Sequence, residues 1–139
     1  GEVGSIRTSG SSTSYNTSSD YRLKENVVAD WDATTRLKQL NPVRFNFIAD
    51  AATTVDGFLA HEVQDIVPEA ISGTKDAMRD EQYEVTSAVF DDDGNVVTPA
   101  VMGTRSVPDY QGIDQSKLVP LLVKTIQELE ARVAALESA

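Results

Sequence analysis

The chain has 139 residues, a formal net charge of −10 at pH 7, and hydrophobic and charged fractions of 40% and 24%, which favour a single acidic globular domain. An acidic surface repels phosphate backbones and anionic lipids, so we expect neither nucleic acid nor a membrane as a partner. The sequence has no cysteine and one histidine, which excludes disulfide bonds and multi-histidine metal sites. We expect no metal and no cofactor.

Residues 1–18 are rich in Ser, Thr and Gly, a composition typical of a flexible or extended segment. They lead into TSSDYRLK (17–24), for which two interpretations stay open. The first is a linker that joins a domain. The second is a nucleophilic Ser19 with Lys24 as its base, because a serine hydroxyl is a poor nucleophile until a base takes its proton. A lysine can do this where burial or a nearby cation such as Arg22 favours the neutral amine, but the spacing by itself favours the linker.

The middle of the chain predicts a small globular head. Alternating apolar and polar residues indicate a half-buried strand, Asp32 is a good helix N-cap, and Asn41-Pro42 and Pro68 end helices. The predicted elements are a helix from Asp32 to about Leu40, a strand at 43–48, a turn at 50–57, a second strand at 57–60 and a short helix at 62–67. His61 has only Glu62 beside it, so a structural role is favoured over acid–base chemistry.

Residues 74–109 are polar and acidic, and they predict an arm that projects from the head. Within them, YEVTSAVF (83–90) and NVVTPAVM (95–102) flank DDDG (91–94), which is a hairpin pattern with Asp-Gly at the turn. The acidic run resembles a calcium loop but lacks the Gly at its sixth position and the Glu at its twelfth, so we interpret it as a turn.

Residues 114–138 predict a long C-terminal helix with an apolar seam at heptad spacing. The seam residues are Val119, Leu122, Ile126, Leu129, Val133 and Leu136. This spacing favours self-association over a helix that packs only on its own head. Val or Ile at the first seam position with Leu at the second nominally favours two strands.

Four stretches resemble, in the same order, one known family. They are SSDYRLKENV (18–27), RLKQLNPVRFNF (36–47), DGFLAHEVQDIVPEAISG (56–73) and YQGIDQSKLVPLLVKTIQELEARVAALE (110–137). They are similar to the peptidase S74 domain, the C-terminal intramolecular chaperone of bacteriophage tail fibres, tailspikes and endosialidases. The resemblance implies an α+β fold with a head of small strands and short helices, a projecting arm, and a C-terminal helix in a trimeric bundle.

The resemblance also implies a division of the chain. Residues 1–18 would be the end of an upstream fibre, and 19–139 the chaperone, with the arm at 74–109 and the trimerisation helix at 114–138. The family's trimer conflicts with the two strands that the seam nominally favours. We follow the family, because the helix is short and the globular parts can set the stoichiometry.

The implied function is that of a homotrimer that assists folding of the upstream fibre or tailspike segment of its own polypeptide. It would then cut the Ser18–Ser19 bond as a single-turnover serine autoprotease acting in cis, with Ser19 as nucleophile and Lys24 as base. The implied location is the host-cell cytoplasm during virion assembly, with release from the mature tail fibre after cleavage.

Two alternatives remain. One is a non-cleaving trimeric tip or assembly domain that stays attached and contacts a receptor. The other is a hydrolase that acts on separate substrates through Ser19 and Lys24, although the sequence contains no GxSxG motif, P-loop or GxGxxG motif to support it.

Overall fold

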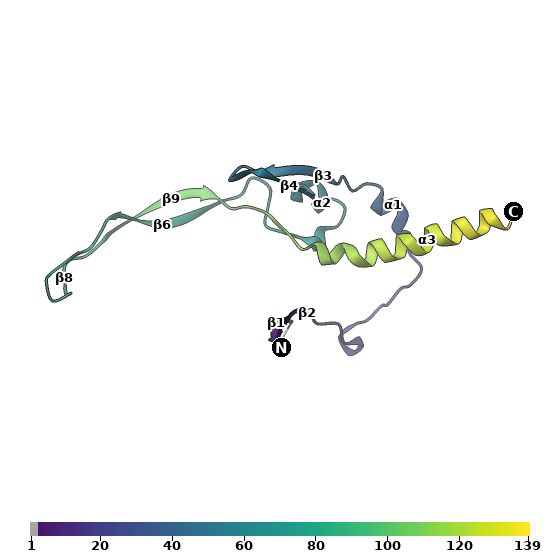
Figure 1. Cartoon of the computed structure of the whole chain (residues 1–139), viewed down its shortest axis with the longest axis horizontal. Helices are drawn as coiled ribbons and strands as arrows, with labels where there is room; N and C mark the ends of the chain where they lie inside the picture. Colours follow the sequence, from purple (N-terminus) through teal and green to yellow (C-terminus); the bar gives the residue numbers. More distant parts are fainter. Residues whose placement is uncertain (1–2) are drawn as a thin grey trace. The chain divides into compact units, whose positions relative to one another are not determined.

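The computed structural model describes residues 3–139, which form two compact units. One unit ends at Trp31, and the other runs from Asp32 to Ala139 (Figure 1). The segment expected to end the upstream fibre lies in the first unit, and its residues 1 and 2 fall outside the described residues. The second unit combines antiparallel strands with helices, so the chain is of mixed α+β class.

The first unit begins with a two-stranded antiparallel ribbon. Strand β1 (Gly4–Ser9) pairs with β2 (Ser12–Thr17), and Ser9 lies opposite Ser12. Gly10 in the turn between them has φ +56°, a left-handed conformation that such tight turns require and that glycine adopts at no steric cost. Almost every side chain of the ribbon is exposed, and an isolated hairpin of this kind has little stability of its own.

The core of the second unit is small and lies where α1 (Ala33–Leu37), α2 (Ala60–Gln64) and the start of α3 (Val119–Glu137) come together. Asp32 caps α1 by accepting from the Thr35 N–H at 3.0 Å, which confirms the predicted start of this helix. Two short 3-10 turns, η2 (Pro68–Ala70) and η3 (Gln115–Leu118), complete the packing. The buried apolar residues are Ala33, Val63, Val67, Ala70, Leu118 and Leu121.

Strand β3 (Val43–Phe47) is confirmed, but the prediction for its partner is wrong. Residues 50–57, expected to be a turn, form β4 (Asp50–Gly57), which pairs antiparallel with β3. The Thr and Val side chains in this stretch are β-branched, and they suit a pleated strand more than a turn. The predicted strand at 57–60 therefore keeps only Gly57, because α2 begins at Ala60.

A long antiparallel ribbon leaves the head between two short strands, β5 (Ile71–Ser72) and β10 (Gly112–Ile113), which pair with each other at its root. Its body is β6 (Met78–Thr86) paired with β9 (Val101–Pro108), and its far part is β7 (Val89–Phe90) paired with β8 (Val96–Thr98). Figure 1 shows this ribbon extending away from β3, β4 and α2.

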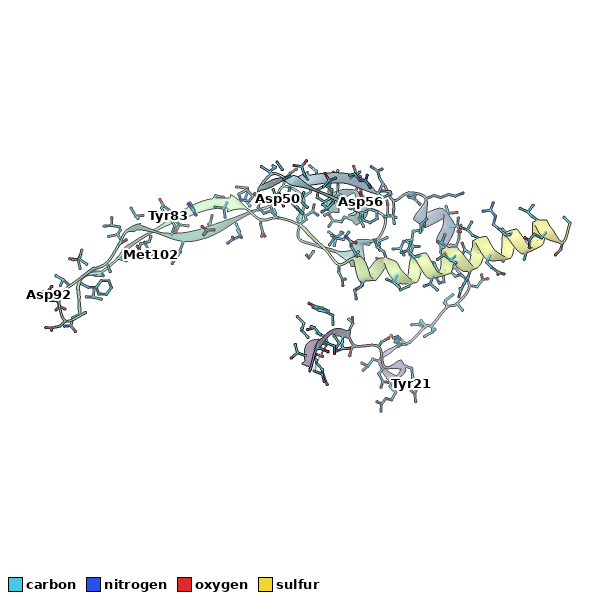
Figure 2. All side chains as sticks on the ribbon, viewed as in Figure 1. Tyr21, Asp50, Asp56, Tyr83, Asp92 and Met102 are labelled. Atoms are coloured by element: carbon cyan, nitrogen blue, oxygen red, sulfur yellow. The ribbon has the colours of Figure 1, made fainter. Side chains whose placement is uncertain are left out.

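The ribbon closes at Asp91, whose side chain accepts from the backbone N–H groups of Asp93 at 3.0 Å and Asn95 at 2.8 Å. Figure 2 places Asp92 at this end, and Tyr83 and Met102 along the ribbon. Halfway along, Tyr83 lies against Gly103, where an added Cβ would approach its ring to 3.2 Å. The Arg105 guanidinium stacks over the same ring and pairs with Glu81.

The predicted C-terminal helix is confirmed in α3, which begins after the single turn η3. Pro120 lies in the first turn of α3, where its missing N–H costs no hydrogen bond. None of the helices in the described part of the chain is long and apolar enough to cross a membrane.

Candidate active site

Ser19 and Lys24 meet in the first unit. The Lys24 Nζ donates a hydrogen bond to the Ser19 Oγ at 2.9 Å. This separation is within the range expected of a nucleophile and its base. The structure therefore brings together the two side chains that the sequence suggested as a pair.

A single 3-10 turn, η1 (Tyr21–Leu23), produces this contact. Asp20 is its N-cap, and its carboxylate accepts from the backbone N–H of Arg22 at 2.9 Å. The backbone N–H of Lys24 then donates to the carbonyl of Tyr21 at 3.1 Å. Asp is a preferred N-cap, so the residue that follows the serine starts the turn that returns the lysine to it.

Arg22 reinforces the turn rather than standing beside Lys24 as an unpaired cation. Its guanidinium binds the Asp20 carboxylate through two atoms, Nε at 2.9 Å and a terminal nitrogen at 2.7 Å. These side-chain bonds, and then the bond from the Arg22 backbone N–H, hold the pKa of Asp20 below its ordinary value. The same pairing raises the pKa of Arg22.

The expected scissile bond, Ser18–Ser19, lies just beyond the ribbon of the first unit. The Ser18 N–H donates to the Val3 carbonyl at 3.0 Å and so continues the pairing of β1 with β2. The next residue, Ser19, is already bonded to Lys24. The bond therefore joins the end of the ribbon to the start of the turn.

The surroundings of the pair are open to solvent. Ser19 and Lys24 are both exposed, and so are the apolar side chains around them. Tyr21, which Figure 2 marks on the turn, is 81% exposed, and Val27 is 80% exposed. In the single chain the Ser19 hydroxyl and the Lys24 amine are thus in hydrogen-bond contact, but they are not shielded from water.

The residues of the predicted seam are all exposed on α3. Ile126 is 65% exposed and Leu136 is 77% exposed, and the other members behave alike: Val119, Leu122, Leu129 and Val133. A different stripe, Leu118, Leu121 and Thr125, is buried against the head. The helix therefore has a buried stripe that packs on the head and a separate apolar heptad seam that the head leaves uncovered.

The sequence analysis did not predict the buried stripe, because it considered only the heptad spacing of the seam. Leu121 follows Leu118 by three positions, and Thr125 follows Leu121 by four, which is the ordinary spacing of a helix face that packs on a core. That spacing was the available signal.

His61 belongs to the second unit, whereas Ser19 and Lys24 belong to the first. It lines a cavity of about 540 Å³ at the root of the ribbon, with Lys75, Asp76 and Asp109 among its neighbours. Lys75 pairs with Asp76 at 2.6 Å. No group of three or more His, Cys, Asp or Glu residues that could hold a metal ion occurs within residues 3–139.

Comparison with known proteins finds one family. Residues 19–72 match the family model Peptidase_S74, described as chaperone of endosialidase. The match confirms the resemblance over those residues. No curated protein matches the chain.

Proposed function

We propose, from the premise that residues 19–72 belong to the peptidase S74 family of chaperones of endosialidase, that the chain is a self-releasing intramolecular chaperone. It trimerises, assists folding of the fibre or tailspike segment upstream, and then cuts the Ser18–Ser19 bond. The family description supports the chaperone role, and the family name supports a peptidase activity. The observation that carries the cleavage is the contact between Lys24 Nζ and Ser19 Oγ.

The reaction requires no separate substrate. The neutral Lys24 amine takes the proton of the Ser19 hydroxyl, and Oγ attacks the carbonyl carbon of Ser18. When the tetrahedral intermediate collapses, the C–N bond breaks and the Ser19 nitrogen takes the proton from Lys24. The result is an ester between the Ser18 carbonyl and the Ser19 oxygen. Water then hydrolyses the ester to give a Ser18 carboxylate, a Ser19 hydroxyl and a new N-terminal amine.

Assembly would supply the shielding that the single chain lacks. A lysine acts as a base more readily where water is excluded, because desolvation disfavours its charged form. The segment beside the pair carries exposed apolar side chains at Tyr21, Leu23, Val27 and Val28. Covering them in the assembled protein would bury the pair as well, so cleavage would follow assembly rather than precede it.

The C-terminal helix is the proposed trimerisation element. Its exposed seam gives a continuous apolar stripe that the head leaves uncovered. Three such stripes packed together would bury the seam in a helical bundle. Leu121, with Leu118 just before the helix, packs on the head along a neighbouring stripe, about 100° around the helix axis from the seam, so one helix can serve both contacts at once.

We assign the first ribbon to the folding client and the second to the part of the chaperone that contacts it. The β1–β2 ribbon, rich in hydroxyl groups and without a core, is the end of the upstream fibre. The long ribbon carries exposed apolar side chains in its far part, where β7 pairs with β8, among them Val89, Phe90 and Val97. These side chains would contact the fibre segment while it folds.

A detachable chaperone suits such a client physically. Intertwined β-fibres depend on contacts between distant residues, and they assemble slowly. A trimeric helical nucleus aligns three chains and raises their effective concentration. Cleavage afterwards removes the nucleus, which leaves the fibre kinetically trapped. We place assembly in the host-cell cytoplasm, with release of the domain from the mature fibre.

The runner-up is a trimeric tip that never cleaves and stays attached to bind a receptor. The exposed state of Ser19 and Lys24 is the observation that favours it. It shares the trimer with the leading proposal, and the fate of the Ser18–Ser19 bond distinguishes the two.

Expression of the chain with its natural upstream segment separates the two. We expect the purified parent to yield a fragment that begins at Ser19, and the Ser19→Ala and Lys24→Ala variants to stay whole as trimers. A parent trimer that remains uncut refutes the cleavage and leaves the attached tip. Cleavage of added peptides by the domain would instead support a hydrolase acting on separate substrates.

A further inference from the structure

The first turn of α1 is held by a residue from the far end of the chain. The backbone N–H groups of Ala33 and Thr34 donate to the two oxygens of the Glu128 carboxylate, at 3.0 Å and 2.8 Å. The Thr34 hydroxyl donates to the same carboxylate. A carboxylate on α3 thus binds three donors at the start of α1.

This contact matters because α1 has five residues and few other means of satisfying its first N–H groups. Asp32 accepts from the third of them, the N–H of Thr35. Glu128 accepts from the first two. Together the two carboxylates satisfy the whole first turn, and each also interacts favourably with the positive end of the helix dipole.

Glu128 occupies a special place on α3. Leu121 and Thr125 before it are buried, Glu128 is half-buried, and residues 129–139 are exposed on every side. Glu128 is therefore the last residue of α3 that the head covers. Beyond it, the helix carries the distal half of the exposed seam.

The chain connects this anchor to the reacting pair. Lys24 is followed by residues 25–32, which contain no helix or strand, and α1 begins directly after them. The segment that carries Lys24 is thus tied down at Ala33 and Thr34, the two residues whose N–H groups Glu128 binds. If α3 were held in a bundle, the contact of Glu128 with Ala33 and Thr34 would be held in place as well.

We propose that Glu128 is a positioning residue for self-cleavage, because it pins the root of the Lys24 segment to the trimerisation helix. This inference rests on the proposed function. Glu128 does not touch the reacting atoms. It limits how far the Lys24 segment can move from α3 once the seam has assembled, and in this way it holds the locally aligned pair where assembly can shield it.

The test uses the chain with its natural upstream segment and compares Glu128→Gln with Glu130→Gln. Both variants remove one negative charge from α3, but Glu130 is exposed and lies two positions beyond the contact. We expect Glu128→Gln to slow cleavage by roughly ten- to a hundredfold, since a small misplacement of a reacting group costs that much. Glu130→Gln should cleave at the parent rate.

Two further measurements separate positioning from loss of structure. Light scattering should give the same trimer mass for both variants. Hydrogen exchange should be faster at the amides of Ala33 and Thr34 in Glu128→Gln alone. Thr34→Ala, which removes only the hydroxyl donor, should give the same two effects in milder form and covers the case in which Glu128→Gln fails to fold.

The outcomes are distinct. A parent that cuts and a Glu128→Gln variant that cuts equally fast overturn the inference and leave the proposed function intact. Slow cleavage that comes with loss of the trimer also overturns it, because the role is then in assembly. A parent that stays uncut overturns the proposed function, and this inference with it.

Discussion

The Lys24 Nζ lies 2.9 Å from the Ser19 Oγ because Asp20, the residue between serine and turn, caps the 3-10 turn that brings the lysine back. The pair is therefore a product of local structure and does not depend on the packing of a core. What the single chain does not provide is shielding, since both residues are exposed. The turn supplies the geometry, and we propose that assembly supplies the shielded environment.

The proposed role of Lys24 as a base predicts the effect of an arginine in its place. Arginine keeps the positive charge and most of the reach but cannot be deprotonated in a protein. We expect Lys24→Arg to lose cleavage by roughly 10²- to 10⁴-fold, the contribution of general-base catalysis, and to form a normal trimer. Lys38→Arg is the matched control and should cleave at the parent rate. Intact mass spectrometry over time measures both rates.

The two-point contact between Arg22 and Asp20 predicts a smaller loss of cleavage rate. Arg22→Lys keeps the charge but removes the two-point contact with the carboxylate. The turn should loosen, and cleavage should slow by roughly tenfold, because Lys24 would then be held less firmly against Ser19. Arg79→Lys, on the ribbon of the other unit, is the control. If Arg22→Lys cleaves as fast as the parent, the two-point contact has no part in aligning the pair.

The acyl shift predicts an ester that can be trapped. Hydroxylamine attacks esters much faster than amides, so it should speed the release of the upstream part. It should also leave a hydroxamate on the Ser18 carbonyl in place of a carboxylate. Mass spectrometry of the upstream fragment distinguishes the two ends. Release that hydroxylamine neither speeds nor modifies would argue for direct attack of water on the amide.

The exposed seam predicts the oligomeric state. Ile126→Asp places a charge in the proposed bundle core, where an unpaired charge is costly, and should reduce the species in solution to a single chain of 15.1 kDa. Gln127→Asp introduces the same residue one position away, outside the seam, and should leave the trimer intact. Light scattering gives the masses. An Ile126→Asp variant with the mass of the parent would exclude the seam as the interface.

The Glu128 contact predicts a dependence of stability on pH. Hydrogen bonds from the Ala33 N–H, and then from the hydroxyl and N–H of Thr34, hold the pKa of Glu128 below its ordinary value of 4.5. A carboxyl group with a lowered folded-state pKa stabilises the fold above its unfolded pKa, and this stabilisation is lost as the pH falls through the folded value.

The parent should therefore be more stable than Glu128→Gln at neutral pH, and the difference should shrink as the pH falls below 4.5. Urea unfolding followed by circular dichroism at several pH values measures it. The comparison cancels the parallel titration of Asp32, whose pKa is also lowered. A difference that stays constant into acid would mean that the charge of Glu128 does not contribute.

Much of the framework could be predicted from local patterns. Asp32 marked the start of α1, and the alternation at 43–48 marked β3. The exposure of the seam could be anticipated from its heptad spacing. The turn predicted at 50–57 was wrong. Asp and Gly at the ends of the stretch favour turns, but the β-branched residues between them favour a strand.

Some features of the candidate site could be predicted from the sequence, and others could not. The spacing of Ser19 and Lys24 left a linker as the better interpretation, and the resemblance to a family reversed that choice. The capping by Asp20 is local and follows a known preference. Glu128 could not have been found, because its partner Thr34 lies 94 residues away and a glutamate in a helix normally faces solvent. Contacts of that range depend on the fold, not on a pattern.

The identity of the new N-terminus after assembly tests the central claim most directly. The chain with its natural upstream segment should be purified as a trimer, incubated, and analysed by intact mass. We expect a downstream fragment whose first residue is Ser19, absent from Ser19→Ala and Lys24→Ala. An uncut parent trimer, or a fragment that begins at any other residue, would contradict self-cleavage by this pair.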